Sequence, residues 1–196
     1  MATRTGERKL QILQVLAQML EDPKGEKITT AALAKRLDVS EAALYRHFAS
    51  KAQMFEGLIE FIEGAVFGLA NKIVAEEENG AKQAHAIVAM LLGFAEKNPG
   101  MTRVLIGDAL MNEDERLQAR VNALQDRLEA TLKQSLRVAA TQTPAPAEGT
   151  PAAAPDPAAQ ANLMLCYVIG RWSQFAKSGF KKKPMELWDK QWPLLA

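Results

Sequence analysis

The sequence predicts an all-α protein with an N-terminal three-helix domain of the helix-turn-helix type and a larger C-terminal helical domain. Three observations support this prediction. Apolar residues recur at three- and four-residue spacing through most of the 196 residues. Capping residues and helix-breaking Pro or Gly residues separate these periodic segments. No segment of any length shows the alternation of apolar and polar residues that is typical of a half-buried strand.

The first fifty residues predict three helices. The apolar face of the first helix comprises Leu10, Leu13, Leu16, Ala17 and Leu20. Residues 22–25 contain Pro and Gly and end it. Thr29 or Thr30 can cap a second helix, whose apolar face is Leu33, Ala34 and Leu37. A tight turn at residues 38–39 follows, and the Ser40 hydroxyl can then accept a backbone N–H at the start of a third helix.

The remaining chain predicts longer helices. Ser50 can cap a fourth helix that runs to about residue 79. We expect a fifth helix over 81–97, a short one around 101–111, a long one over 113–140, and another from about residue 158. The long helix carries an apolar stripe of Leu117, Val121, Leu124, Leu128, Leu132 and Leu136. Residues 141–159 contain five of the nine prolines with seven alanines, which predicts a flexible Pro/Ala connector.

The composition limits the classes of function. The net charge is only +1, but residues 1–51 hold nine Lys and Arg against six Asp and Glu, so we expect any DNA affinity in that region. The single cysteine, Cys166, excludes an internal disulfide and is expected to be a small buried residue. The first residues lack an apolar signal core, and no run reaches the ~18 apolar residues of a membrane span. We therefore expect a cytoplasmic protein without a membrane contact.

The stretch from Ser40 to Lys51 indicates a recognition helix. A short helix with small residues can lie close to the floor of the major groove, while donors at its end contact phosphates. The start of the second helix also favours phosphates. The predicted DNA-binding residues are Thr29, Thr30, Ser40, Glu41, Ala42, Ala43, Tyr45, Arg46, His47 and Lys51. The alternatives are ordinary caps at Thr30 and Ser40, surface residues at Tyr45 and His47, and solvated charges at Arg46 and Lys51.

Residues 28–51, which include Val39-Ser-Glu-Ala-Ala-Leu-Tyr-Arg-His-Phe48, resemble the DNA-binding domain of the tetracycline-repressor (TetR) family. Segments of the second domain resemble one branch of that family, the nucleoid occlusion factors of the SlmA type. These segments are residues 58–63, 91–100, 107–111, 114–122 and 189–194. The resemblance implies a DNA-binding domain over residues 1–51 and a dimerisation and partner-binding domain over residues 52–196.

The resemblance also implies an activity. Proteins of this branch bind dispersed chromosomal sites, engage the tubulin-like division protein FtsZ, and prevent the division ring from assembling over the nucleoid. FtsZ has a short C-terminal tail with apolar and acidic residues. The family's FtsZ-binding positions correspond to Phe61, Met90, Gly93, Lys97 and Asn98. From the residues alone, Phe61 and Met90 can equally be core, Gly93 can serve helix packing, and residues 98–100 can simply stop a helix.

We further expect a symmetric homodimer, in one or several copies per palindromic site, and a nucleoid-associated location. Its interface is predicted on the helices over 113–140 and 158–177, at Leu128, Leu132, Ile169 and Trp172. The alternative function is a ligand-responsive repressor of the TetR type, with a pocket lined by His85, Tyr167, Arg171 and Trp172. Core packing is the stronger interpretation for the aromatic residues of that set, and a surface or dimer-interface charge is the stronger one for Arg171. No cofactor, metal site or enzymatic motif is expected. The lysine run at 181–183 is interpreted as a solvated turn, with a membrane or DNA contact as the alternative.

Overall fold

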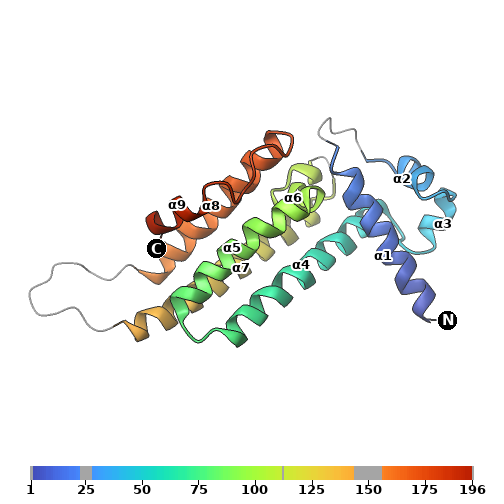
Figure 1. Ribbon diagram of the computed structural model, residues 1–196. Helices are drawn as coiled ribbons and strands as arrows, with labels where there is room; N and C mark the ends of the chain where they lie inside the picture. The colour runs from blue at the N-terminus through green and yellow to red at the C-terminus, as the bar shows by residue number, and fades with distance from the viewer. Residues whose placement is uncertain (1, 23–27, 112, 144–155, 196) are drawn as a thin grey trace, which may run out of the picture. The chain divides into compact units, whose positions relative to one another are not determined.

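The computed structural model describes residues 2–22, 28–111, 113–143 and 156–195 (Figure 1). Every regular element within these ranges is a helix, as predicted. None of the helices in the described ranges is long and apolar enough to span a membrane.

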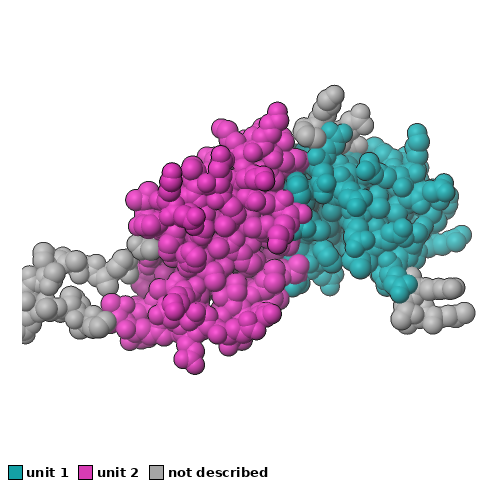
Figure 2. Space-filling model, viewed as in Figure 1, with its two compact units in different colours: residues 1–64, 98–121 teal, residues 65–97, 122–196 magenta. Residues whose placement is uncertain are grey.

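The chain forms two compact units, drawn in different colours in Figure 2. Unit 1 comprises Met1–Gly64 and Asn98–Val121, and unit 2 comprises Ala65–Lys97 and Asn122–Ala196. The units therefore do not divide at residue 51, where we place the functional boundary. That boundary stays a prediction. Two long helices, α4 (Lys51–Glu76) and α7 (Glu115–Gln142), each contribute residues to both units.

Unit 1 contains α1 (Ala2–Met19), α2 (Thr30–Arg36), α3 (Glu41–Tyr45) and the first half of α4. It also contains α6 (Pro99–Leu105), the short 3-10 helix η1 (Asp108–Leu110) and the first residues of α7. The predicted apolar faces of α1 and α2 are buried, except that Leu10 is 40% exposed. That assignment of Leu10 to the core was wrong, because the buried part of α1 begins two residues later, at Ile12.

The second segment of unit 1 holds the first segment through α6. A Cβ added at Gly100 would lie 1.9 Å from the Ala17 carbonyl oxygen, so only glycine permits this close approach of α6 to α1. The Arg103 guanidinium donates to the Leu20 and Asp22 carbonyl oxygens at 3.2 and 3.3 Å. It also pairs with Asp108 at 2.6 Å. These contacts fix the end of α1 against residues that lie about eighty positions away in the sequence.

Unit 2 is built on α5 (Gly80–Lys97), the main part of α7, and α8 (Pro157–Lys177), followed by α9 (Trp188–Gln191) and η2 (Trp192–Leu194). The Trp172 indole is fully buried, and its N–H donates to the Leu91 carbonyl oxygen at 3.1 Å. A Cβ added at Gly80 would lie 2.2 Å from the Ser135 carbonyl oxygen, so α5 begins directly against the backbone of α7. The predicted stripe on α7 is confirmed, because all six of its apolar residues are buried.

The predicted connector is shorter than expected. α7 continues to Gln142, and α8 already begins at Pro157. Asp156 caps α8 by accepting the backbone N–H groups of Ala158 and Ala159, and proline is favourable at the first helical position. Of the predicted connector, residues 144–155 lie outside the described residues.

Candidate nucleic-acid interface

Two short helices in unit 1, α2 and α3, form the predicted helix-turn-helix. The Thr29 hydroxyl oxygen accepts the Ala32 N–H at 3.1 Å, and the Ser40 hydroxyl oxygen accepts the Ala43 N–H at 3.3 Å. These side chains satisfy amide groups that a helix start leaves unpaired, so both predicted caps are confirmed. Between the helices, Asp38 has a φ of 55°, a left-handed conformation that aspartate tolerates better than most residues.

A side-chain contact joins α2 to α3. The Thr30 hydroxyl donates to a Glu41 carboxylate oxygen at 2.5 Å, and Glu41 is exposed. The side chains of two predicted DNA-binding residues are therefore hydrogen-bonded to each other. Ala42 is also exposed and Ala43 is half-buried, whereas Leu44, which follows them, is fully buried. Between Glu41 and Tyr45 the surface of α3 is thus small and uncharged, which permits close approach of a large partner at Ala42 and Ala43.

The side chains expected to donate hydrogen bonds at the end of α3 differ in their exposure to solvent. α3 ends at Tyr45, whose side chain is 45% exposed, and Arg46 in the following turn is exposed as well. His47 is half-buried, and its Nδ1 is buried without a hydrogen-bond partner among the described residues. A phosphate therefore cannot reach Nδ1 and can meet the ring only at Nε2. That nitrogen is then the one that can donate to an anion.

Lys51 has a partner that the sequence did not indicate. Its ammonium forms an ion pair with the Glu113 carboxylate and lies 5.6 Å from the centre of the Phe55 ring. The side chains of Lys51 and Glu113 are only 23% and 14% exposed. A phosphate would therefore compete with Glu113 for the Lys51 ammonium. Sixty-two residues separate the two partners, so no local sequence pattern could have identified Glu113.

The predicted FtsZ-binding residues are distributed over both units and are described separately. In unit 1, Phe61 is 37% exposed and Asn98 is half-buried. In unit 2, Met90 and Gly93 are half-buried and Lys97, at the end of α5, is exposed. A Cβ added at Gly93 would meet no heavy atom within 4 Å. Packing within the described residues therefore gives no reason for a glycine at this position.

Three of the four predicted dimer-interface residues belong to the protomer's own core. Leu128, Leu132 and Trp172 are fully buried, so their side chains present no surface to a second copy, and the prediction was wrong for them. Ile169 is half-buried. The exposed side of α8 consists instead of Ala159, Asn162, Leu163, Cys166, Gly170, Gln174 and Lys177. Cys166 was expected to be buried but is exposed, because this side of α8 has no covering helix in the protomer.

The residues proposed for an effector pocket are engaged in packing. His85 lies against the Trp188 and Trp192 rings, at 5.0 and 4.8 Å between ring centres. The Tyr167 hydroxyl donates to Gln191 at 2.8 Å, and burial raises the pKa of Tyr167. Arg171 was expected at the surface but is buried. Within the described residues, no group of His, Cys, Asp and Glu is arranged to hold a metal ion.

Known proteins resemble both parts of the chain. The family model for bacterial regulatory proteins of the tetR family matches residues 25–58, and the model for a tetracyclin repressor-like C-terminal domain of the SlmA-like type matches residues 78–196. A nucleoid occlusion factor SlmA from Alteromonas mediterranea is 53% identical over 97% of this chain and 95% of the relative. The chain belongs to the SlmA family.

Other comparisons agree with SlmA family membership. A nucleoid occlusion factor SlmA from a Marinomonas species is 51% identical over the whole of this chain and 96% of the relative. The fold resembles the transcriptional regulator FadR from Bacillus subtilis solved with stearoyl-CoA, with a TM-score of 0.76, 12% identity and coverage of 95% and 96% of the two chains. It also resembles AibR solved with isovaleryl coenzyme A and operator DNA, with a TM-score of 0.71, 17% identity and coverage of 94% and 95%. At such identities the likeness shows the TetR-like fold alone. As a member of the SlmA family, the protein is a DNA-binding regulator and not an enzyme.

Proposed function

We propose that this protein binds palindromic chromosomal sites as a homodimer and, when bound there, engages FtsZ and prevents division-ring assembly over the nucleoid. Membership of the SlmA family supports the proposal. The observation that carries its DNA-binding part is the exposure of Tyr45 and Arg46 at the end of a short, capped helix. The protein is then nucleoid-associated, and residues 1–51 supply its DNA contacts.

The DNA contacts fall into two kinds. Tyr45, Arg46 and His47 are placed to donate to phosphate oxygens, and the amide groups at the start of α2 add a favourable dipole. These phosphate contacts position the DNA-binding domain on the duplex but do not depend on its base sequence. The small exposed surface at Ala42 and Ala43 lets α3 approach base edges, where apolar contact with thymine methyl groups is possible. The hydrogen bond between the Thr30 and Glu41 side chains keeps α2 and α3 together while the domain binds DNA.

The dimer uses the exposed side of α8. Leu163 is 51% exposed, and the small residues at 159, 166 and 170 share its side at helical spacing. Gly170 has open space where a Cβ would lie, which allows a second helix to approach its backbone. Replacing Leu163 with Glu would then place a charge in the interface and produce monomers in analytical ultracentrifugation, while Ala81→Glu, which adds the same charge at an exposed position of α5, leaves the dimer intact. A dimeric Leu163→Glu protein would contradict this interface.

The FtsZ contact is supported by Gly93 and Phe61. Glycine in a helix interior costs about 1 kcal/mol relative to alanine, and Gly93 has no neighbour that requires it. A partner peptide that approaches the α5 backbone supplies the missing reason. An exposed phenylalanine such as Phe61 suits an apolar anchor, and the exposed Lys97 suits a carboxylate of the tail.

Co-sedimentation of FtsZ polymers tests this function. We expect the protein with a palindromic duplex to reduce the pelleted FtsZ, and neither component alone to do so. Gly93→Glu and Phe61→Ala should each abolish the effect without changing DNA affinity. Ala81→Glu, which adds the same charge at an exposed position of the same helix, is the matched control. Full activity of the Gly93→Glu and Phe61→Ala proteins, or no effect of the wild type, would favour a ligand-responsive repressor instead.

A further inference from the structure

The segment between α8 and α9 carries three consecutive lysines that the proposed function does not use. We call residues 178–185 the lysine loop. Lys181, Lys182 and Lys183 are all exposed, and no ion pair among the described residues involves them. Their charges are therefore available to a partner.

Polar side chains hold the backbone of the lysine loop in place. The Ser178 hydroxyl oxygen accepts the N–H groups of Lys181 and Lys182 at 3.1 and 2.9 Å. The Arg171 guanidinium donates to the carbonyl oxygens of Lys183 and Pro184 at 2.8 and 3.1 Å. A long basic loop of this kind is usually mobile in solution, whereas this one is pre-organised. A fixed loop loses little conformational entropy when it binds.

Two further features distinguish the loop from an ordinary solvated turn. Phe180 has a φ of 63°, a left-handed conformation that is rare and unfavourable for a bulky residue, and its ring packs on Phe175 at 5.1 Å. Arg171 is buried, its hydrogen-bond partners are carbonyl and amide oxygens, and no ion pair among the described residues involves it. Its guanidinium thus adds a positive charge that is bonded to the backbone of the lysine loop.

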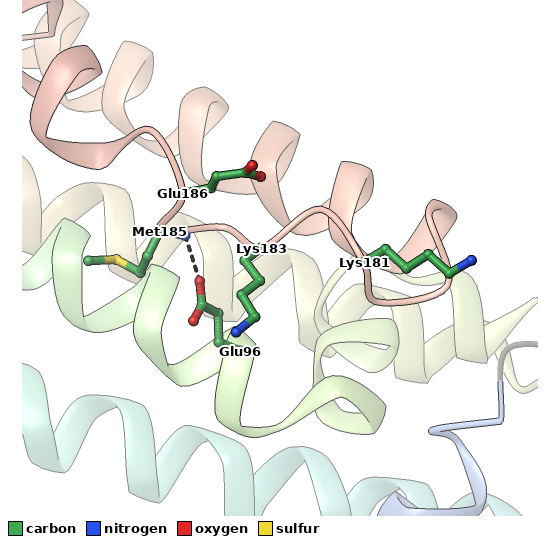
Figure 3. Close-up of a pocket in the computed structure, with 5 residues that line it drawn as sticks. All are labelled: Glu96, Lys181, Lys183, Met185 and Glu186. Carbon is green, nitrogen blue, oxygen red and sulfur yellow. Dashed lines mark hydrogen bonds between the residues drawn. The ribbon is translucent and has the colours of Figure 1, made fainter.

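The loop borders a surface pocket of about 340 Å³. Figure 3 shows its lining, which comprises Glu96, Lys181, Lys183, Met185 and Glu186. The Glu96 carboxylate accepts the Met185 N–H at 2.8 Å and so ties the loop to the last turn of α5. The pocket thus offers two ammonium groups, two carboxylates and one thioether. This mixture suits a ligand that carries separate acidic and apolar groups.

We propose that the lysine loop and its pocket bind an acidic segment of a polypeptide. Carboxylates of that segment pair with Lys181 and Lys183, and an apolar side chain contacts Met185. A DNA backbone or an anionic membrane would present negative charge uniformly and would meet Glu96 and Glu186 as well. A peptide can place an uncharged residue opposite them. The mixed lining therefore favours the peptide.

The position of the loop suggests which peptide it binds. Glu96 directly precedes Lys97, the proposed contact for an FtsZ carboxylate, and Glu96 is bonded to the loop. The loop therefore lies at the end of α5 that carries Lys97, within unit 2. We assign the acidic segment to the FtsZ tail, and this assignment rests on the proposed function. The proposal that the loop binds an acidic peptide does not rest on the proposed function.

Fluorescence anisotropy with two labelled peptides tests the proposal. One peptide is the FtsZ C-terminal tail, measured with the full-length protein bound to a palindromic duplex, and the other is an unrelated glutamate-rich peptide. Lys181→Gln with Lys183→Gln should weaken binding of both by about fivefold at low salt, because two partly exposed ion pairs are lost. The salt dependence should also decrease. Lys181→Arg with Lys183→Arg should retain binding. The control, Lys190→Gln with Arg137→Gln, removes two exposed charges elsewhere in unit 2 and should change neither affinity.

The outcomes separate this proposal from the proposed function. If the tail binds the wild type and the Gln variant equally, the loop proposal is overturned and the FtsZ contact stands. If only the glutamate-rich peptide binds, and the variant loses it, the FtsZ contact fails while the loop keeps its peptide chemistry. If neither peptide binds the wild type, both are overturned. A loss of affinity for the duplex, or for vesicles with anionic lipid, at unchanged peptide affinity would assign the loop to DNA or membrane and overturn the proposal.

Discussion

The helix-turn-helix of unit 1 and the helix pair α7–α8 of unit 2 use their residues in opposite ways. α2 and α3 have only seven and five residues, and each begins with a side-chain cap. Their buried residues are few, and the candidate functional side chains lie outside. α7 and α8 have 28 and 21 residues, and the protomer itself buries their main apolar stripes. In unit 1 the capping and other polar residues therefore indicated a candidate binding surface. In unit 2 the apolar periodicity indicated only which residues form the core.

The difference has a physical basis. Helices shorter than about 12 residues are marginal in isolation, so α2 and α3 depend on caps and on the surrounding unit, and the caps can be recognised locally. A long helix can have two apolar faces, and spacing alone does not say whether the protomer or a second copy covers each one. α8 is of this kind, with Trp172 inside and Leu163 outside.

The largest expected effect tests whether Trp172 belongs to the core. Trp172→Ala removes a fully buried indole and should lower the free energy of unfolding by about 3–5 kcal/mol. Lys82→Ala, an exposed change on α5, should alter it by less than about 0.5 kcal/mol. Chemical denaturation at fixed protein concentration measures both. A small effect of Trp172→Ala would return this residue to a surface role.

The next prediction compares two glycines of α5. Gly80→Ala forces a methyl group against the α7 backbone and should destabilise the protein by about 3 kcal/mol, the upper end of over-packing. Gly93→Ala adds a methyl group in open space and should stabilise the protein by up to about 1 kcal/mol, because alanine is the better helix former. Thermal unfolding of the two variants measures the difference. A Gly93→Ala protein that melts below the wild type would show that Gly93 is packed, and a Gly80→Ala protein that melts with the wild type would contradict the close contact with α7.

A smaller effect concerns the DNA face of unit 1. Arg46→Gln should weaken binding to any duplex by about tenfold. It should also reduce the slope of log affinity against log salt concentration by about one unit per DNA-binding domain. Lys51→Gln should have less effect, because Glu113 already neutralises part of the Lys51 charge. Glu113→Gln should therefore strengthen binding. Titrations at several salt concentrations check this order, and a stronger effect at Lys51 than at Arg46 would contradict it.

The smallest effect concerns a local contact before α7. The Arg116 guanidinium bonds Asp114 at 2.7 and 3.0 Å and holds the pKa of that carboxyl at about 2, below its ordinary 3.8. Because the folded pKa is depressed, the contact stabilises the protein above pH 3.8 and is lost as the pH falls towards 2. NMR titration of Asp114 should show the low midpoint, and Arg116→Ala should return it towards 3.8. An ordinary midpoint in the wild type would exclude the contact.

Much of the fold could be predicted from the sequence, because its signals are local. The caps at Thr29, Ser40 and Ser50 and the stripe on α7 were all identified correctly. The contacts that were missed join residues far apart in the sequence. Lys51 pairs with Glu113, and the buried Arg171 serves carbonyl groups of a loop twelve and thirteen residues later. Residue spacing does not indicate such partners. Lys51 and Arg171, which were predicted to be surface charges, are therefore engaged with other residues.

The two-segment composition of unit 1 limits how the DNA-binding head can be exchanged between relatives. Transplanting residues 1–51 alone would separate Ala17 from Gly100, Leu20 from Arg103 and Lys51 from Glu113. A chimera built at that junction should express poorly even where the recognition helix is intact. A graft that also carries residues 52–64 and 98–121 keeps every one of these pairs together. The module that must be exchanged is therefore larger than the stretch proposed to contact DNA.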